Sequence, residues 1–323
     1  MAPSVLHESG LRIHFPIAYM SLFTIGFVPS LEAMPLVAEG ATASQWSLWP
    51  SPSYGRIMRQ LLANQIAVGL LPLDVFLAEI VNRPALISRW RVPIVLPAAP
   101  IDLVLTQRIM KQIHMTAANN KTTPLEKITI GIESRNSLTR YQFIEWLQAQ
   151  TNCKKLKVSF KMLPMELMFK ALKSESLDGC MLPTPWGFEA NDHPEYQLVP
   201  TFTAGKLNQE LVLCWNSEMT TLHSKDWHIL LNRLAKRRGI LETDAADFDR
   251  TANTMSARTL PHCHPHHLKL SAERYLGTMS KAHFCPDFKW IDDQIARHAR
   301  LLPTLSQAKG LEILGRSLAL EGV

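Results

Sequence analysis

The chain has 323 residues, of which 46% are hydrophobic and 19% charged, and this globular balance excludes an intrinsically disordered protein. The formal net charge of +6 comes from 34 basic and 28 acidic residues. The basic residues are scattered, apart from 236–238, which argues against nucleic acid as a direct partner. The five cysteines are far apart and form no CxxC pair, so no disulfide framework is predicted. No run approaches the ~18 consecutive apolar residues of a membrane-spanning helix.

Apolar patterning and turn residues predict that strands and helices alternate along most of the chain. The expected strands are 23–28, 46–49, 66–72, 92–96, 102–106, 128–131, 156–162, 177–182 and 211–215. The expected helices are 35–39, 54–63, 73–81, 137–146, 165–173, 227–237, 245–255, 266–278 and 288–302. Alternation of this kind is typical of an α/β protein.

A strand, a helix and a second strand predicted between 156 and 182 lead into a rigid turn, 183–186. Ligands of such units usually bind at the carboxyl ends of the strands. The run 164–172, with 177–179 and Pro185-Trp186, resembles the second lobe of the nitrate- and bicarbonate-binding proteins of ABC importers, within the wider nitrate/sulfonate/taurine solute-binding family. Further matches in the same register are 23–29 with Ala33 and 35–36, 128–131 with Ser137, Tyr141, Trp146 and Leu147, and the Trp-x-x-x-Gln-x-x-Arg pattern of Trp290, Gln294 and Arg297.

The resemblance implies an α/β, two-lobe periplasmic-binding-protein-like fold of type II, in which each lobe is a mixed sheet flanked by helices. We expect residues 1–21 to be an N-terminal extension, 22–105 and 216–323 to form lobe 1, and 106–215 to form lobe 2. Two crossings between the lobes make a hinge, so the lobes can close on a small solute.

Five residues are candidates for the ligand site. The resemblance places Tyr54 where the nitrate-binding members carry a tryptophan, Thr139 where they carry a histidine, and Glu210 where they carry a lysine. Asp102 lies near a glutamine of theirs. Trp186 is expected to line the cleft because it follows a Pro-x-Pro turn at the carboxyl end of a strand. From the residues alone, Tyr54 can also be a half-buried aromatic and Thr139 a helix cap.

The charges of this set argue against nitrate as the ligand. Glu210 in place of a cation, beside the carboxylate of Asp102, would repel a bare anion. Two alternatives remain open. A divalent cation such as Ca2+ would bridge Glu210 to an anion such as bicarbonate, in the way that the bicarbonate-binding branch implies. An amine-bearing or zwitterionic solute would instead pair its positive end with Glu210 or Asp102.

The segment 261–267 is unusual because it holds four histidines and a cysteine. Imidazole and thiolate suit Zn2+ or Cu+, so His262, His264 and His266 are candidate metal ligands. Adjacent ligands wrap one tetrahedral ion poorly, and a surface loop is the alternative interpretation. The resemblance offers no counterpart to this segment.

No catalytic motif of the GxSxG, HExxH, phosphate-loop or Gly-rich dinucleotide type is present, so the expected function is binding and the protein is not an enzyme. The leading interpretation is the solute-binding protein of a nitrate/bicarbonate/sulfonate-type ABC importer, with a small anion or zwitterion and an ABC permease as partners. One alternative is a cytoplasmic ligand sensor of the same fold that acts on a regulatory protein. Another is a metal-using biosynthetic enzyme. Residues 1–28 show no signal peptide or lipobox, which predicts a cytoplasmic chain, or a periplasmic one if a leader lies upstream.

Overall fold

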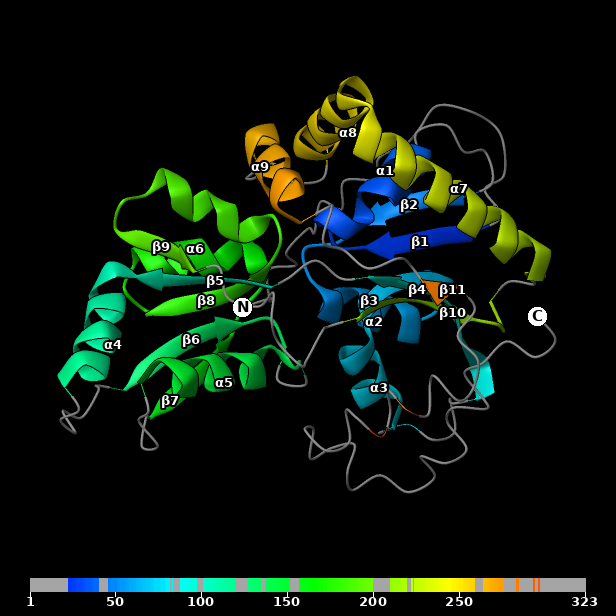
Figure 1. Ribbon diagram of the computed structural model, residues 1–323. Helices are drawn as coiled ribbons and strands as arrows, with labels where there is room; N and C mark the ends of the chain where they lie inside the picture. Colours follow the sequence, from blue (N-terminus) through cyan, green and yellow to red (C-terminus); the bar gives the residue numbers. More distant parts are fainter. Residues whose placement is uncertain are drawn as a thin grey trace, which may run out of the picture.

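The computed structural model describes residues 23–40, 46–81, 83, 88–97, 101–119, 127–134, 137–151, 157–199, 210–219, 222, 224–258, 264–275, 283–284, 293 and 296. Within these ranges the chain forms two α/β halves that lie side by side (Figure 1). The expected extension at 1–21 and the matching positions Trp290, Gln294 and Arg297 lie outside the described residues.

Strands and helices alternate in the described residues, as the apolar pattern predicts. The strands are β1 (Phe23–Phe27), β2 (Trp46–Pro50), β3 (Val68–Pro72), β4 (Trp90–Pro97), β5 (Ile101–Thr106), β6 (Ile128–Ile132), β7 (Val158–Met162), β8 (Gly179–Pro183), β9 (Tyr196–Val199), β10 (Glu210–Asn216) and β11 (His283–Phe284). The α-helices are α1 (Met34–Gly40), α2 (Tyr54–Leu62), α3 (Leu73–Val81), α4 (Gln107–Asn119), α5 (Thr139–Thr151), α6 (Met165–Lys173), α7 (Ser224–Thr243), α8 (Ala245–Arg258) and α9 (Pro265–Tyr275). The 3-10 helices are η1 (Leu31–Ala33) and η3 (Trp186–Asp192).

The described strands form two mixed sheets. The first has the order β11-β4-β10-β3-β1-β2, in which β1 is parallel to β2 and β3, and β10 is antiparallel to β3 and β4. The second has the order β7-β6-β8-β5-β9, in which β6 is parallel to β7 and β8, and β5 is antiparallel to β8 and β9. This confirms the expected fold class of two mixed sheets flanked by helices.

The sheets exchange one strand each relative to the expected lobe boundaries. A boundary after residue 105 would leave β5 in lobe 1, but β5 pairs with β8 and β9 in the second sheet. A boundary after 215 would leave β10 in lobe 2, but β10 pairs with β3 and β4 in the first sheet. Both assignments therefore need correction, because strand partners are chosen by contacts distant in sequence. We propose that the two sheets and the helices packed on them are the two lobes.

Helix α2 packs against the first sheet where two strands carry glycine. A Cβ at Gly69 would come within 2.7 Å of Leu61 Cδ1 and 2.8 Å of Ile57 Cγ2, so the helix lies almost on the backbone of β3. The apolar face of α2 is buried there, with both Ile57 and Leu61 at 0% exposure. This packing fixes where the helix begins, at the carboxyl-end edge of β1 and β3.

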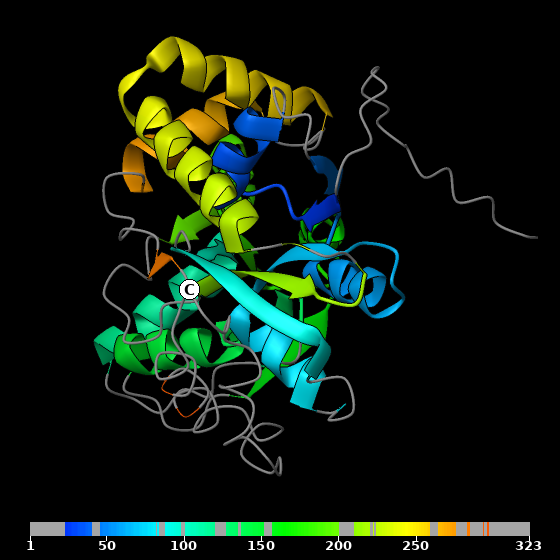
Figure 2. The same cartoon turned by 90° about the vertical axis from the view of Figure 1, so that its right-hand side faces the viewer.

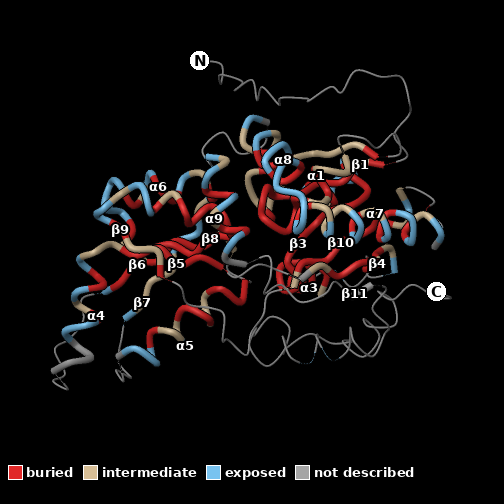
Figure 3. Tube along the Cα trace, turned by 45° about the horizontal axis from the view of Figure 1, so that its top comes forward, coloured by how far each residue is buried: buried red, intermediate tan, exposed pale blue. Residues whose placement is uncertain are grey.

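The buried residues form a core that continues from one lobe to the other (Figure 3). Val28 and Leu31 of lobe 1 belong to the same buried cluster as Leu182 and Trp186 of lobe 2. Helices α7 and α8 pack over α1 on the outside of lobe 1 (Figure 2), and α9 contacts both η1 and η3. The lobes are therefore in direct contact at the carboxyl ends of their strands. No helix within the described part of the chain is long and apolar enough to cross a membrane.

Candidate functional site

The N-terminus of α2 is held from both lobes. Within lobe 1, the Ser53 hydroxyl accepts a hydrogen bond from the Arg56 backbone N–H at 3.1 Å and caps the helix. From lobe 2, Glu133 Oε1 accepts hydrogen bonds from the backbone N–H groups of Tyr54 and Gly55, the second at 3.2 Å. A carboxyl group of one lobe thus ends on a helix N-terminus of the other, where the helix dipole favours negative charge.

Glu133 directly follows strand β6, so it lies at a strand's carboxyl end. Burial raises its pKa from 4.5 to about 8, and the charge of Asp74 adds to the rise. The hydrogen bonds from the Tyr54 and Gly55 backbone oppose that rise because they stabilise the ionised form. The carboxyl group therefore titrates close to neutral pH, and a cation bound nearby would favour its ionised form.

Asp74 makes the reciprocal contact from lobe 1. It is the second residue of α3, directly after β3, and it is 0% exposed. One carboxylate oxygen accepts a hydrogen bond from the Val75 backbone N–H at 2.8 Å, and the other accepts one from the Leu138 backbone N–H at 2.5 Å. Leu138 immediately precedes α5 of lobe 2. Each lobe therefore places a carboxyl group on a helix N-terminus of its neighbour.

The Tyr54 side chain is 5% exposed and lies in negative surroundings. Burial raises the pKa of its phenol well above 10, and the charges of Glu32, Glu133 and Asp74 raise it further, while a hydrogen bond with Ser30 lowers it. The phenol is therefore neutral at physiological pH. The groups that act on it by charge are carboxylates from both lobes, with Glu32 and Asp74 in lobe 1 and Glu133 in lobe 2.

Trp186 connects the lobes through its indole. The side chain is 8% exposed, and its Nε1–H donates a hydrogen bond to the Pro29 carbonyl oxygen at 2.7 Å. Close by, the Leu31 backbone N–H donates to the Thr184 carbonyl oxygen at 3.0 Å. Pro29 and Leu31 follow β1 of lobe 1, whereas Thr184 follows β8 of lobe 2. The structure thus places Trp186 at the contact between the lobes, where its indole N–H is used, and its expected role in lining a ligand cleft stays a prediction.

Asp102 lies on β5 beside the turn that carries Trp186. It is 1% exposed and pairs with Leu182, near the carboxyl end of β8. A Cβ at Gly187 would come within 2.3 Å of Asp102 Cβ, so the carboxylate side chain fits only against a glycine. Asp102 thus helps to seat the Trp186 turn.

Thr139 and Glu210 lie in different surroundings. Thr139 is the first residue of α5 and is 7% exposed, and its backbone N–H donates to the Ser137 hydroxyl at 3.3 Å. Thr139 therefore lies next to Leu138, whose backbone N–H donates a hydrogen bond to Asp74. Glu210 is the half-buried first residue of β10, opposite Pro97, on the first sheet. Tyr54, Thr139 and Trp186 are brought to the contact between the lobes. Asp102 lies on β5 of the second sheet and Glu210 on β10 of the first sheet, so the expected pair of carboxylates is divided between the two sheets.

The histidine segment is divided by burial. His264 and His266 are exposed, His262 lies outside the described residues, and His267 is 2% exposed. His267 Nε2 lies 3.0 Å from Asp192 Oδ2, and burial lowers the pKa of this imidazole while Asp192 opposes that shift. Helix α9 is thereby tied to η3 of lobe 2. In the part of the chain that is described, no group of three His, Cys, Asp or Glu side chains is placed to hold a metal ion.

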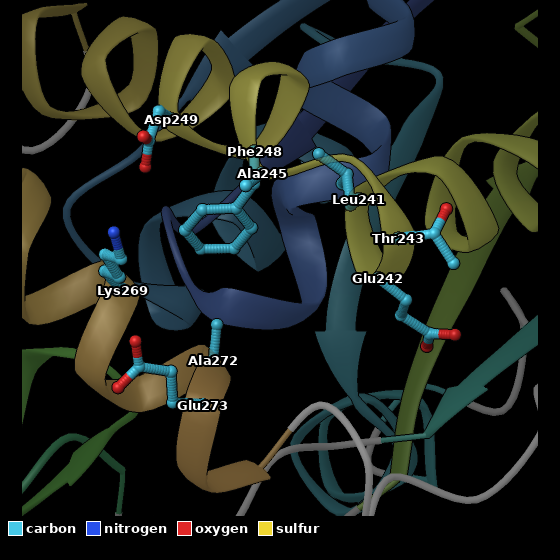
Figure 4. A pocket seen from close by; sticks show the side chains of 9 residues that line it. All are labelled: Leu241, Glu242, Thr243, Ala245, Phe248, Asp249, Lys269, Ala272 and Glu273. Carbon is cyan, nitrogen blue, oxygen red and sulfur yellow. The ribbon is translucent and has the colours of Figure 1, made fainter.

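A surface pocket of about 430 Å³ lies between α7, α8 and α9 (Figure 4). The Phe248 ring points into it from α8, while Lys269 and Glu273 reach it from α9 (Figure 4). Its lining consists of Leu241, Glu242, Thr243, Ala245, Phe248, Asp249, Lys269, Ala272 and Glu273. The five candidate ligand residues are not among them.

Sequence reasoning missed the carboxyl groups whose charges act on Tyr54. Glu133 and Asp74 each stand within two residues of a strand's carboxyl end, the position at which ligands of α/β sheets usually bind. Glu32 lies further along, in η1, five residues after the end of β1. The placement of Asp74 and Glu133 was a readable signal, but nothing local in the sequence shows that all three groups would act on Tyr54.

The chain was compared with known protein families, curated sequences and solved structures. No model of a known protein family and no curated protein sequence matches the chain. Solved structures do match it. The alkanesulfonate-binding protein SsuA of Xanthomonas axonopodis pv. citri, bound to MOPS, has a TM-score of 0.67 and 13% identity, covering 94% of this chain and 99% of that chain. The periplasmic nitrate-binding protein NrtA of Synechocystis PCC 6803 has a TM-score of 0.66 and 10% identity, covering 93% and 86%.

A third similar structure is the ligand-binding component of an ABC-type import system of Staphylococcus aureus, with zinc bound. Its TM-score is 0.66 at 14% identity, and the match covers 90% of this chain and 99% of that chain. The chain has the periplasmic-binding-protein fold. These three proteins are ligand-binding proteins, and two of them are the nitrate- and sulfonate-binding proteins to which the sequence resemblance pointed. At these identities the likeness shows the fold and leaves the ligand to be argued from the residues.

Proposed function

We propose that the protein is a solute-binding protein that holds a small amine-bearing solute between its lobes and presents it to an ABC importer. The observation that carries the ligand class is that the charges of Glu32, Asp74 and Glu133 all act on the buried Tyr54 phenol. The importer role is supported by the fold, which this chain has in common with ABC-importer components.

An ammonium group suits these surroundings for two physical reasons. Buried carboxylates are costly unless positive charge compensates them, and a bound ammonium would supply that charge. The face of an aromatic ring such as Tyr54 also attracts cations, by about 0.5 to 2 kcal/mol depending on how far the site is desolvated. A bare nitrate ion would meet repulsion from the same carboxylates. The amine interpretation therefore replaces the oxyanion as the favoured ligand, and its positive end is assigned to Tyr54 and Glu32.

The test is a thermal-shift and calorimetric screen of purified protein. The panel contains short diamines, quaternary ammonium compounds and amino acids, against nitrate, alkanesulfonates, and bicarbonate with and without Ca2+. We expect binding from the amine-bearing compounds, and loss of that binding in Glu32→Gln. The exposed Glu218, which pairs with Arg89 at 3.1 Å, provides the control Glu218→Gln, in which binding should be unchanged. Stabilisation by the anions and none by the amines would contradict the proposal.

A further inference from the structure

The position that Glu133 occupies is one where a small anion would be bound. Two consecutive backbone N–H groups, those of Tyr54 and Gly55, converge on a single carboxyl oxygen at the N-terminus of a nine-residue helix. Such N–H groups carry partial positive charge and bind carboxylates and other oxyanions readily. In this protein the oxygen comes from the chain itself, 79 residues along the sequence and from the opposite lobe.

Capping of α2 alone does not account for Glu133. The helix already has a local cap, since the Ser53 hydroxyl accepts from the Arg56 N–H at 3.1 Å. Both hydrogen bonds that Glu133 Oε1 accepts cross from lobe 2 to lobe 1. The side chain therefore acts between the lobes.

A second, independent contact has the same form in the opposite direction. Asp74 of lobe 1 accepts the Leu138 N–H at 2.5 Å, at the start of α5 in lobe 2. Both carboxyl groups lie just after a strand. Each accepts a hydrogen bond from a backbone N–H at the start of a helix in the opposite lobe. The lobes are thus joined through carboxyl groups that the chain itself supplies.

We propose that Glu133 is an internal ligand whose carboxyl group fills the anion position at the N-terminus of α2 and excludes free carboxylates and inorganic oxyanions. Glu133 is then a specificity-determining residue. Its removal leaves two N–H donors in a buried space of carboxylate size, which a small monocarboxylate can fill. The inference holds whichever solute the lobes bind, because it rests only on the contact between Glu133 and α2.

The experiment compares Glu133→Ala with Glu133→Gln and the wild type. Sodium formate and sodium acetate are titrated by calorimetry and thermal shift, with sodium chloride at equal ionic strength as reference. We expect formate or acetate to bind Glu133→Ala about tenfold or more tightly than the wild type. Glu133→Gln keeps an oxygen that accepts both N–H groups, so it should behave like the wild type. Glu145, an exposed residue of α5, provides the control Glu145→Ala, which should gain no anion binding.

Equal responses of the wild type, Glu133→Ala and Glu145→Ala to formate would overturn the proposal. If Glu133→Ala does not fold in plain buffer, its refolding with formate and with chloride is compared instead. Recovery with formate alone supports the internal-ligand role, and failure with both contradicts it. Amine binding is measured separately on the wild type, so a failure of the proposed function is distinguishable from a failure of this inference.

Discussion

The two lobes supply one carboxyl group each to the contact between them, and they hold it differently. Asp74 of lobe 1 accepts one hydrogen bond from Val75 of its own helix and one from Leu138 across the contact. Glu133 of lobe 2 accepts its two hydrogen bonds from Tyr54 and Gly55, both in the opposite lobe. Separation of the lobes would leave Asp74 with a partner, whereas Glu133 would lose both.

This difference suggests a division of roles. Asp74 is anchored in α3 whether or not the lobes touch, so it has a structural role in lobe 1 as well as a role at the contact. Glu133 gains its hydrogen bonds only when the lobes meet, and a hydrogen bond to a neutral carboxyl group contributes about 0.5 to 1.5 kcal/mol. Glu133 is therefore the side chain through which lobe closure and anion exclusion are coupled.

The largest effect is expected when Asp74 is removed. Asp74→Ala deletes the acceptor for buried N–H groups of both lobes, and we expect the free energy of unfolding to fall by about 2 to 4 kcal/mol. Urea denaturation followed by circular dichroism measures the change. The matched control is Asp244→Ala, because Asp244 accepts the Ala246 and Asp247 N–H groups at 3.0 and 3.1 Å within a single lobe and near the surface. That loss should be about 1 kcal/mol.

Equal losses in the two alanine variants would remove the distinction between a cap within one lobe and a carboxylate shared by two. A larger loss in Asp74→Ala that is accompanied by an unchanged contact between the lobes, seen as unchanged hydrogen exchange at Leu138, would place its role in α3 alone.

The pH dependence of stability tests the other half of the comparison. Glu133 has a pKa of about 8 in the folded protein against 4.5 for an unperturbed carboxyl, so between these values the folded state binds more protons than the unfolded state. The contribution of Glu133 to the free energy of unfolding is therefore fully present below pH 4.5, the pKa of the unfolded state. It is lost as the pH rises toward the folded-state pKa of about 8. We expect the free energy of unfolding to fall as pH rises from about 5 to about 8 and to level off above that, and to fall less in Glu133→Gln. Parallel curves for the two proteins, by urea denaturation, would contradict the raised pKa.

The sequence predicted the layers of the fold better than the contacts between them. The strand at 128–131 and the helix beginning at Tyr54 could be predicted because apolar spacing is a local signal. The lobe assignment of β5 and β10 could not, since strand pairing joins residues far apart. The same limit applied to the site. Trp186 was predicted from its turn, but Glu133 and Asp74 meet partners 79 and 64 residues away, and no local pattern specifies such a contact.

The smallest effect is expected from removing the uncharged hydrogen bond between Trp186 and Pro29. This change tests whether the carboxyl groups contribute most of the stability of the contact between the lobes. Trp186→Phe keeps an aromatic ring but deletes the indole N–H that binds the Pro29 carbonyl at 2.7 Å. Trp227 gives the control, because it is 1% exposed and its Nε1 has no hydrogen-bond partner among the described residues. We expect Trp186→Phe to lower the free energy of unfolding by about 1 kcal/mol more than Trp227→Phe.

The two tryptophan variants should also differ in where they loosen the protein. The Leu31 N–H donates to the Thr184 carbonyl next to the Trp186 contact, so its hydrogen exchange should accelerate in Trp186→Phe and stay unchanged in Trp227→Phe. If Trp186→Phe opened the lobes as far as Asp74→Ala does, the contact would depend on packing at β1 and β8 more than on charge. A small, local acceleration would instead leave the paired carboxyl groups as the main connection, with Glu133 as the part that depends on closure.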